Sequence, residues 1–344
     1  MKIPVHVWML AAMAAGVAMA CWVIGRDGLD AVIHAAAGIG IPGFVGFCLY
    51  SAATALFLGG AWVLCVPGLS PWRHLLLFTG ARLVREGAAD LLPFSQLGGL
   101  VVGARVLIAR GHRAAQVNAA MAVDITTEMA AQVVFTLFGI AGLAALGHGG
   151  SAGIGKGLLG PLLLGAGAMV ALSMVFLVAQ RWILMFAARL VESHLPAVGA
   201  RLGDVADGIS QVYRQRKRVL GSFLCNLGGW LTSAAGAWLA LELMGIHLAL
   251  GRVLVLESLI FTVRSVGFLI PGALGVQEAA YAMLAPLVGL SSPAALGLSL
   301  VKRARDLVQG GAALLGWQWS EFRKARALTR TGQDKHYPGG AANG

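Results

Sequence analysis

The sequence predicts an all-α polytopic membrane protein, with about six spanning helices and two re-entrant helical hairpins in inverted repeats. Of its 344 residues, 58% are hydrophobic and only 12% are charged, whereas soluble domains carry about 25% charged residues. Several apolar runs reach the roughly 20 residues that cross a hydrocarbon core. Two stretches that contain proline and glycine, with charged residues nearby, interrupt this apolar pattern.

Six apolar runs are expected to span the bilayer as helices. They are Val5–Ile24, Phe44–Val66, Ala114–Leu146, Leu158–Ala179, Val219–Met244 and Pro293–Trp317. The first run contains AMAC, which is similar to a signal-peptidase site, but the run is longer than a usual signal peptide and a retained helix is favoured. Residues 1–320 therefore form a single integral-membrane domain.

Two further segments lie outside these spans. Residues 184–212 alternate apolar and charged side chains, which predicts a helix on the cytoplasmic surface. Residues 321–344 are basic and end in PGGAANG, so a disordered tail is expected there.

The formal net charge of +11 is concentrated in three groups of basic residues. They lie at 110–113, at 201–218 and at 323–330. Because basic loops face the cytoplasm, six spans place all three groups and both termini on that side. This placement accounts for the positive charge without a nucleic-acid partner.

The chain repeats itself at an offset of 178 positions. At this offset Asp124 corresponds to Lys302 and Glu128 to Asp306. Repeat 1 covers about 44–146 and repeat 2 about 222–320. The threading puts the first break between cytoplasmic loops and the second between external loops, so the repeats are predicted to be inverted, as in many secondary transporters.

Each repeat contains one of the two breaks, LLPFSQLGG and LIPGALGVQE. The segments before them, Leu75–Leu92 and Val253–Ile270, carry charges that are too costly for a lipid-facing span. Short helices at Phe94–Ala109 and Gln277–Val288 follow, and broken backbone at this depth needs protein or water around it. The predicted hairpin tips contain Pro93, Gly98, Gly99, Pro271, Gly272 and Gly275.

Seven cations and seven acids fall within the presumed membrane region. The candidates for a substrate or proton pathway are Arg82, Arg85, Glu86, Asp90, Asp124, Glu128, Glu257, Arg264, Glu278, Lys302, Arg305 and Asp306, and Arg105 and Arg303 complete the count. Ion pairs that lock the hairpins to spanning helices are one interpretation. A polar cavity for a charged head group or for protons is the other, and it accounts better for so many ionisable groups together.

Two arrangements of these charges are expected. Glu86 and Arg264 occupy equivalent repeat positions with opposite signs, which predicts that the hairpins face each other there. Asp124 and Glu128 lie one helical turn apart near mid-depth. Either they share a proton, or Arg82 and Arg85 keep both ionised around an anionic cargo group.

No catalytic residue, metal site or cofactor is predicted. The four cysteines are scattered singly, with no CxxC and no histidine at metal spacing, so they are interpreted as inert buried thiols. A lipid-modifying membrane enzyme would need an acid–base pair beside a nucleophile or metal, and the sequence contains no such set.

The motifs REGAADLLPFSQLGG, GARVLIARG, VDITTEMAAQ and LIPGALGVQEAAY resemble the lysylphosphatidylglycerol synthase transmembrane, flippase-like superfamily. The most specific part is the tip with Pro271, Gly272, Gly275 and Glu278. The first half looks closest to the branch associated with hopanoid biosynthesis in bacteria. The resemblance covers about Trp8–Trp319.

This resemblance implies a multi-pass protein of the bacterial inner membrane that handles lipids. We expect a transporter or flippase for a hopanoid, polyprenyl or anionic lipid; a scaffold or partner for hopanoid-biosynthesis enzymes is the alternative. The synthases carry a large soluble transferase domain after the membrane part. Only about 25 residues follow the last predicted span of this chain, so aminoacylation by this chain alone is not expected.

Overall fold

A computed structural model describes residues 21–22, 29–91, 95–147, 196–266 and 273–334, together with residues 160, 164, 167, 171 and 175. The elements are α2 (Leu29–Ala37), α3 (Gly40–Leu64), α4 (Pro71–Leu91), α5 (Ser95–Ile108), α6 (Ala114–Gly147), α8 (Pro196–Arg214), α9 (Arg216–Leu243), α10 (Leu250–Val266), α11 (Val276–Leu284), the 3₁₀ helix η2 (Ala285–Val288) and α12 (Ser292–Asp334). The described residues include no strand, so the all-helical prediction is confirmed for them.

Four of the predicted spans coincide with helices α3, α6, α9 and α12. Within the described residues, Gly40–Leu64 and Ala114–Leu146 are long and apolar enough to cross a membrane. Helices α9 and α12 are both longer than α3 but carry polar side chains, such as Asn226 and Lys302. The predicted spans Val5–Ile24 and Leu158–Ala179 lie almost wholly outside the described residues.

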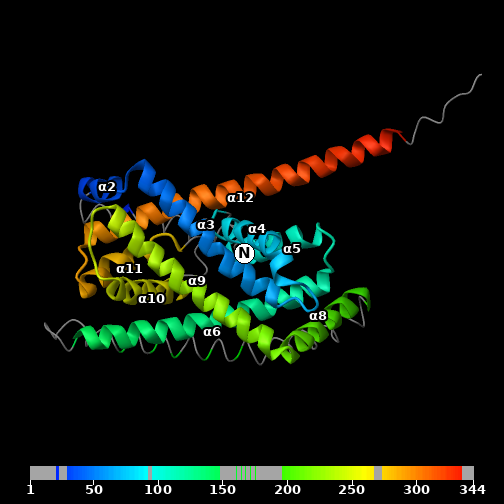
Figure 1. The fold of residues 1–344 in the computed structure, drawn as a ribbon, viewed down its shortest axis with the longest axis horizontal. Helices are drawn as coiled ribbons and strands as arrows, with labels where there is room; N and C mark the ends of the chain where they lie inside the picture. The colour runs from blue at the N-terminus through cyan, green and yellow to red at the C-terminus, as the bar shows by residue number, and fades with distance from the viewer. Residues whose placement is uncertain are drawn as a thin grey trace, which may run out of the picture.

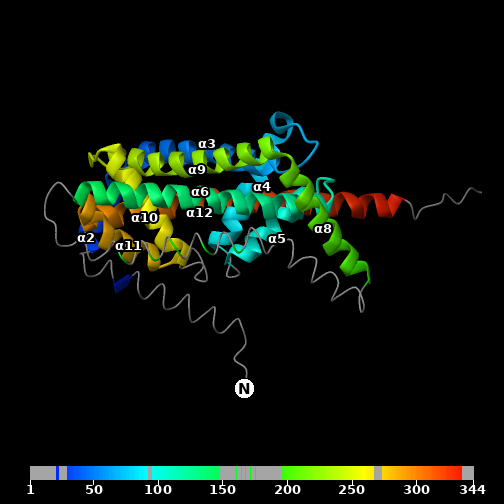
Figure 2. The same cartoon turned by 90° about the horizontal axis from the view of Figure 1, so that it is seen from below.

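Helices α3 and α9 pack side by side in opposite directions (Figure 1). Gly43, near the start of α3, lies against Leu243 at the end of α9, and Gly221 near the start of α9 lies against Leu64. Figure 2 shows this pair as one outer layer, with α6 and α12 beside it and α5 and α11 on the far side.

The helix boundaries recur at the offset found in the sequence. Adding 178 to 114, the first residue of α6, gives 292, the first residue of α12. The same shift carries α3 onto α9 and α4 onto α10 to within two residues at their starts. Since the equivalent helices α3 and α9 run antiparallel, the two repeats have the relative orientation that an inverted duplication requires.

The helices on either side of each break also run antiparallel. Gly99 and Gly103 of α5 both lie against Arg85 of α4, and a Cβ at Gly99 would be only 2.5 Å from the carbonyl oxygen of Arg85. In the second repeat, Arg252 at the start of α10 donates to the carbonyl of Val288 at 3.4 Å. The helix pairs are therefore compact units within each repeat.

Arg218 of α9 caps the C-terminal end of α3. Its guanidinium donates to the carbonyls of Val63, Leu64, Val66 and Leu69 over 2.9–3.2 Å. The last carbonyls of a helix have no partner within the helix. A side chain from α9 thus stabilises the end of its repeat equivalent.

Three helical segments lie outside the repeats or extend beyond them. Residues Leu29–Ala37, which include His34, form helix α2, and this helix packs on α12. In α8, Ile209 and Val212 are buried against α6, so this part of the predicted surface helix packs on protein. Helix α12 continues to Asp334 and projects from the body (Figure 1), where a disordered tail was expected from residue 321.

Candidate functional site

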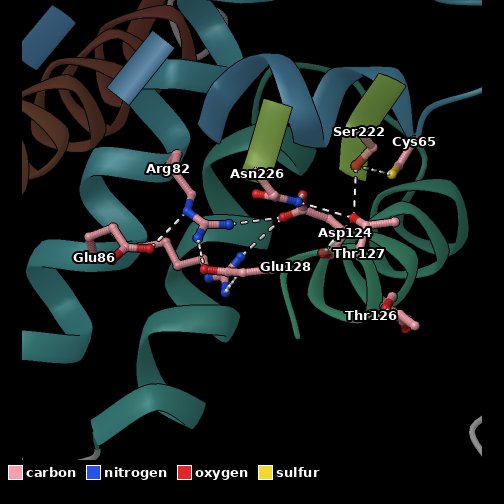
Figure 3. Close-up of polar contacts among 11 residues, drawn as sticks. Cys65, Arg82, Glu86, Asp124, Thr126, Thr127, Glu128, Ser222 and Asn226 are labelled. Carbon is pink, nitrogen blue, oxygen red and sulfur yellow. Dashed lines mark hydrogen bonds and ion pairs between the residues drawn. The ribbon is translucent and has the colours of Figure 1, made fainter. Parts of the chain in front are cut away.

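The first repeat contains a buried ion network of four residues, Arg82, Arg85, Asp124 and Glu128. Arg82 lies 2.9 Å from Asp124 Oδ2 and 2.5 Å from Glu128 Oε1. Arg85 reaches the same two carboxylates at 3.4 and 3.3 Å. This first network joins α4 to α6 (Figure 3).

The first network is dry at its centre, with side-chain exposures of 1% for Arg82 and 0% for Asp124. Asn226 of α9 donates to Asp124 Oδ1 at 3.3 Å. Donors from Arg82, Arg85 and Asn226 therefore surround both oxygens of Asp124. Both arginines thus contact both acids in this structure.

A chain of one thiol and two hydroxyl groups leads to the backbone carbonyl of Asp124 (Figure 3). Cys65 donates to Ser222 Oγ at 3.3 Å, and the hydroxyls of Ser222 and Thr127 are 2.9 Å apart. Thr127 donates to the carbonyl oxygen of Asp124 at 2.9 Å. Since the Thr127 proton is used there, Ser222 donates to Thr127, and the whole chain is directed toward Asp124.

The second repeat contains a different buried network, formed by Glu257, Tyr281 and Lys302. Lys302 Nζ lies 2.5 Å from Glu257 Oε2 and 2.9 Å from the Tyr281 hydroxyl, which itself donates to Glu257. The ammonium also lies 5.3 Å from the centre of the Phe261 ring. This second network joins α10, α11 and α12 and is buried throughout.

The start of α11 is held to α12 by Glu278. Its carboxylate accepts from the backbone N–H of Gly275 at 2.8 Å, from Ser299 at 3.1 Å and from Arg303 at 3.2 Å. Gly275 has a φ of +77°, a conformation that favours glycine. Glu278 thus caps its own helix and anchors the second helix pair.

The remaining charges are partly exposed and lie where the ends of α4 and α10 meet. Arg264 lies 4.0 Å from Asp90, and both side chains are 22% exposed. Arg305 pairs with its neighbour Asp306 at 2.5 Å. We call Glu86, Asp90, Arg264, Arg305 and Asp306 the open end of the charge system.

The predicted contact between Glu86 and Arg264 is wrong, because each of the two residues pairs with a different residue. Glu86 lies 2.8 Å from Arg82, one turn back on α4, and Arg264 contacts Asp90 instead. Asp90 is one turn further along α4 than Glu86, so the two repeats do meet through opposite charges but at a different residue.

Other predicted positions lie apart from these networks. Arg105 is exposed in the last turn of α5. Gly98 is half-buried, and Gly99 allows α5 to approach α4. Pro93, Pro271 and Gly272 lie outside the described residues.

Sequence reasoning missed several polar partners. Tyr281, Asn226 and Ser299 each bind a charged residue of the networks. Single uncharged side chains in apolar helices give no sequence signal of their own, although Gln277 and Tyr281 fall within the motif after the second break. Among the described residues, no group of three His, Cys, Asp or Glu side chains is placed to hold a metal ion.

The described residues define a class: an all-helical protein with several ion pairs buried between its helices. The chain belongs to the family described as the lysylphosphatidylglycerol synthase TM region, which matches residues 8–312. It is therefore a helical integral-membrane protein. The match is to the membrane region alone, includes no catalytic domain, and does not distinguish a hopanoid-associated branch. No curated protein and no solved structure gave a significant match.

Proposed function

We propose that this protein transports lipids across the bacterial inner membrane, with both termini in the cytoplasm. In this proposal α4–α5 and α10–α11 are re-entrant hairpins of inverted repeats, and their broken ends meet near the middle of the bilayer. Such an arrangement places a polar site at the depth where alternating-access transporters bind cargo.

The observation that supports transport is the contrast between dry and open charges. Arg82, Asp124, Glu257 and Lys302 are buried and tightly paired, as expected of groups that hold helices together. Asp90 and Arg264 are partly exposed and 4.0 Å apart. Ionisable groups in a membrane interior are costly unless they are paired or wetted, and they commonly mark substrate pathways.

The same contrast indicates where the molecule can open. The first network fixes α4 to α6, and Glu257–Lys302 and Glu278–Arg303 fix the α10–α11 pair to α12. The contact of Asp90 with Arg264 is the longest of the interior ion pairs in the described residues. A relative movement of the two repeats therefore breaks this contact first and exposes both charges to a head group.

The charged open end favours a cargo with a charged head group over an uncharged polycyclic or polyprenyl chain. The hopanoid link and an association with hopanoid-biosynthesis proteins rest on the sequence resemblance alone. The alternative function is a scaffold that does not transport lipids, and the experiment below distinguishes it from a transporter.

Transport is tested with purified protein in liposomes that contain phospholipids labelled on an acyl chain. Wild-type protein should speed transbilayer movement, and Arg264→Gln should slow it by about tenfold or more, the effect of losing a charged hydrogen bond. Arg105→Gln is the matched control and should move lipid like the wild type. Folded wild-type protein that moves none of the tested lipids would leave the scaffold as the remaining function.

A further inference from the structure

The interior charges of the described chain do not balance. Arg105, in the last turn of α5, forms no ion pair with the other charges in the described residues, whereas Glu86 contacts Arg82. Six interior cations remain, Arg82, Arg85, Arg264, Lys302, Arg303 and Arg305, against seven acids, Glu86, Asp90, Asp124, Glu128, Glu257, Glu278 and Asp306. The interior is one positive charge short.

The shortage falls on the open end. Four acids are matched outside the open end: Asp124 and Glu128 by two arginines, Glu257 by Lys302, and Glu278 by Arg303. Asp306 is matched by Arg305. Two acids of this set are then left, Glu86 and Asp90, and one cation, Arg264. Glu86 also contacts Arg82, but Arg82 is already counted against Asp124 and Glu128.

The surroundings of Asp90 sharpen this point. Glu86 and Asp90 are four residues apart on α4, so their carboxylates share one face of the helix. The Glu86 side chain is 45% exposed, which leaves room for a ligand beside it.

Arg264 offers the complementary chemistry at the same place. Its one ion-pair contact within the described residues is the 4.0 Å approach to Asp90. A guanidinium presents a planar set of N–H donors that matches the two free oxygens of a phosphodiester. A short dipolar ligand can therefore place an anion on Arg264 and a cation between the two carboxylates.

We propose that the open end binds the head group of a zwitterionic aminophospholipid, with its primary ammonium between Glu86 and Asp90 and its phosphodiester on Arg264. The proposal rests on lipid transport as the function and specifies the cargo. An anionic head group leaves the surplus acid uncompensated. A choline head group has the charge but lacks the N–H donors that two carboxylates can accept.

The first test compares acyl-chain-labelled phosphatidylethanolamine, phosphatidylcholine and phosphatidylglycerol in liposomes. The ethanolamine lipid should cross at least about tenfold faster than the other two, which is the effect of one charged hydrogen bond. Asp90→Asn should remove this preference, and Asp207→Asn, an exposed carboxylate on α8, should keep it. Equal or faster movement of the glycerol or choline lipid would overturn the proposal.

The second test measures binding without transport, so that the two proposals can fail separately. Short-chain phosphatidylethanolamine should raise the Tm of the wild type in detergent more than the choline or glycerol lipids do, because a ligand stabilises the state that binds it. In lipid-free detergent, Asp90→Asn should have a higher Tm than the wild type, since it removes the surplus charge, and added ethanolamine lipid should then have no selective effect.

Two results in the second test would count against this cargo. Equal stabilisation by all three lipids would show that the ammonium is not recognised. Stabilisation by mild acidity alone, with no further effect of the ethanolamine lipid, would show that a proton occupies the position between the carboxylates in place of the ammonium. Selective stabilisation without any transport would support the site and refute the transport function.

Discussion

Arg82 binds three carboxylates at once, those of Glu86, Asp124 and Glu128. We predict that Arg82→Gln destabilises the protein by about 3–5 kcal/mol, because removal of one partner leaves buried charge uncompensated. Thermal unfolding in detergent would measure the loss, with the exposed Arg105→Gln as the control. Similar melting of the two variants would contradict a structural role for the first network.

Tyr281 stands between the two charges of the second network, donating to Glu257 and accepting from Lys302. Tyr281→Phe keeps the ring but removes the hydroxyl, and we expect a loss of about 1.5–3 kcal/mol, as for a hydrogen bond to a charged group. Tyr50→Phe is matched chemically and removes only a bond to the Thr232 carbonyl. It should cost about 1 kcal/mol or less by the same measurement.

The contact of Asp90 with Arg264 predicts a specific charge exchange. The double variant Asp90→Arg, Arg264→Asp should recover stability beyond the sum of its single changes, by up to about 1 kcal/mol for a partly exposed pair. The exchange of Glu86 with Arg264 should recover less, because Glu86 contacts Arg82. A double-mutant cycle of thermal stabilities checks both, and the reverse order would show that Glu86 is the true partner.

At the scale of the helices, close crossings depend on glycine. A Cβ on Gly59 of α3 would lie 2.2 Å from Thr79 Oγ1 and 2.6 Å from its backbone, whereas one on Gly46 would meet nothing within 4 Å. Backbone cannot move aside as a side chain can. We predict that Gly59→Ala destabilises by about 1–3 kcal/mol through overpacking.

Gly46→Ala on the same helix should be neutral or stabilising by up to about 1 kcal/mol, since alanine is the better helix former. The pair separates packing from helix propensity in a single thermal-unfolding comparison. Equal effects of the two substitutions would mean that α3 and α4 do not approach as closely as described.

The sequence predicted helices well and their partners poorly. Apolar length located α3 and α6, and the shared offset related α6 to α12, because these signals run along the chain. The contact between Asp90 and Arg264 depends on how two helices rotate against each other. A rotation by one turn exchanges Glu86 for Asp90, and no linear pattern fixes it.

The sequence identified the charged residues of the candidate site but did not separate the structural ones from those that could bind a ligand. Each was identified because charged residues are rare in apolar membrane segments. Which of them are dry depends on neighbours such as Asn226 and Tyr281, whose side chains are ordinary in a helix. The sequence alone could not separate the groups that hold helices together from those at the open end.

At the scale of the whole molecule, the proposed inverted repeats predict a topology. Single cysteines at Arg113, before α6, and at Ser291, before α12, are both exposed and should be labelled from opposite sides of the membrane. Membrane-impermeant reagents applied to intact and to permeabilised spheroplasts provide the measurement. Labelling of both positions from the same side would refute the inverted arrangement.

The antiparallel packing of α3 on α9 has a consequence for how such a protein could have arisen. If two identical half-length chains had assembled about a twofold axis, every residue would have faced a partner surface of the same composition. Such a pair cannot assign a cation to one half and an acid to the other at one site. Asp124 and Lys302, or Glu86 and Arg264, have opposite signs at equivalent positions. A single chain can therefore carry opposite charges at equivalent positions, which a symmetric pair of identical half-length chains cannot.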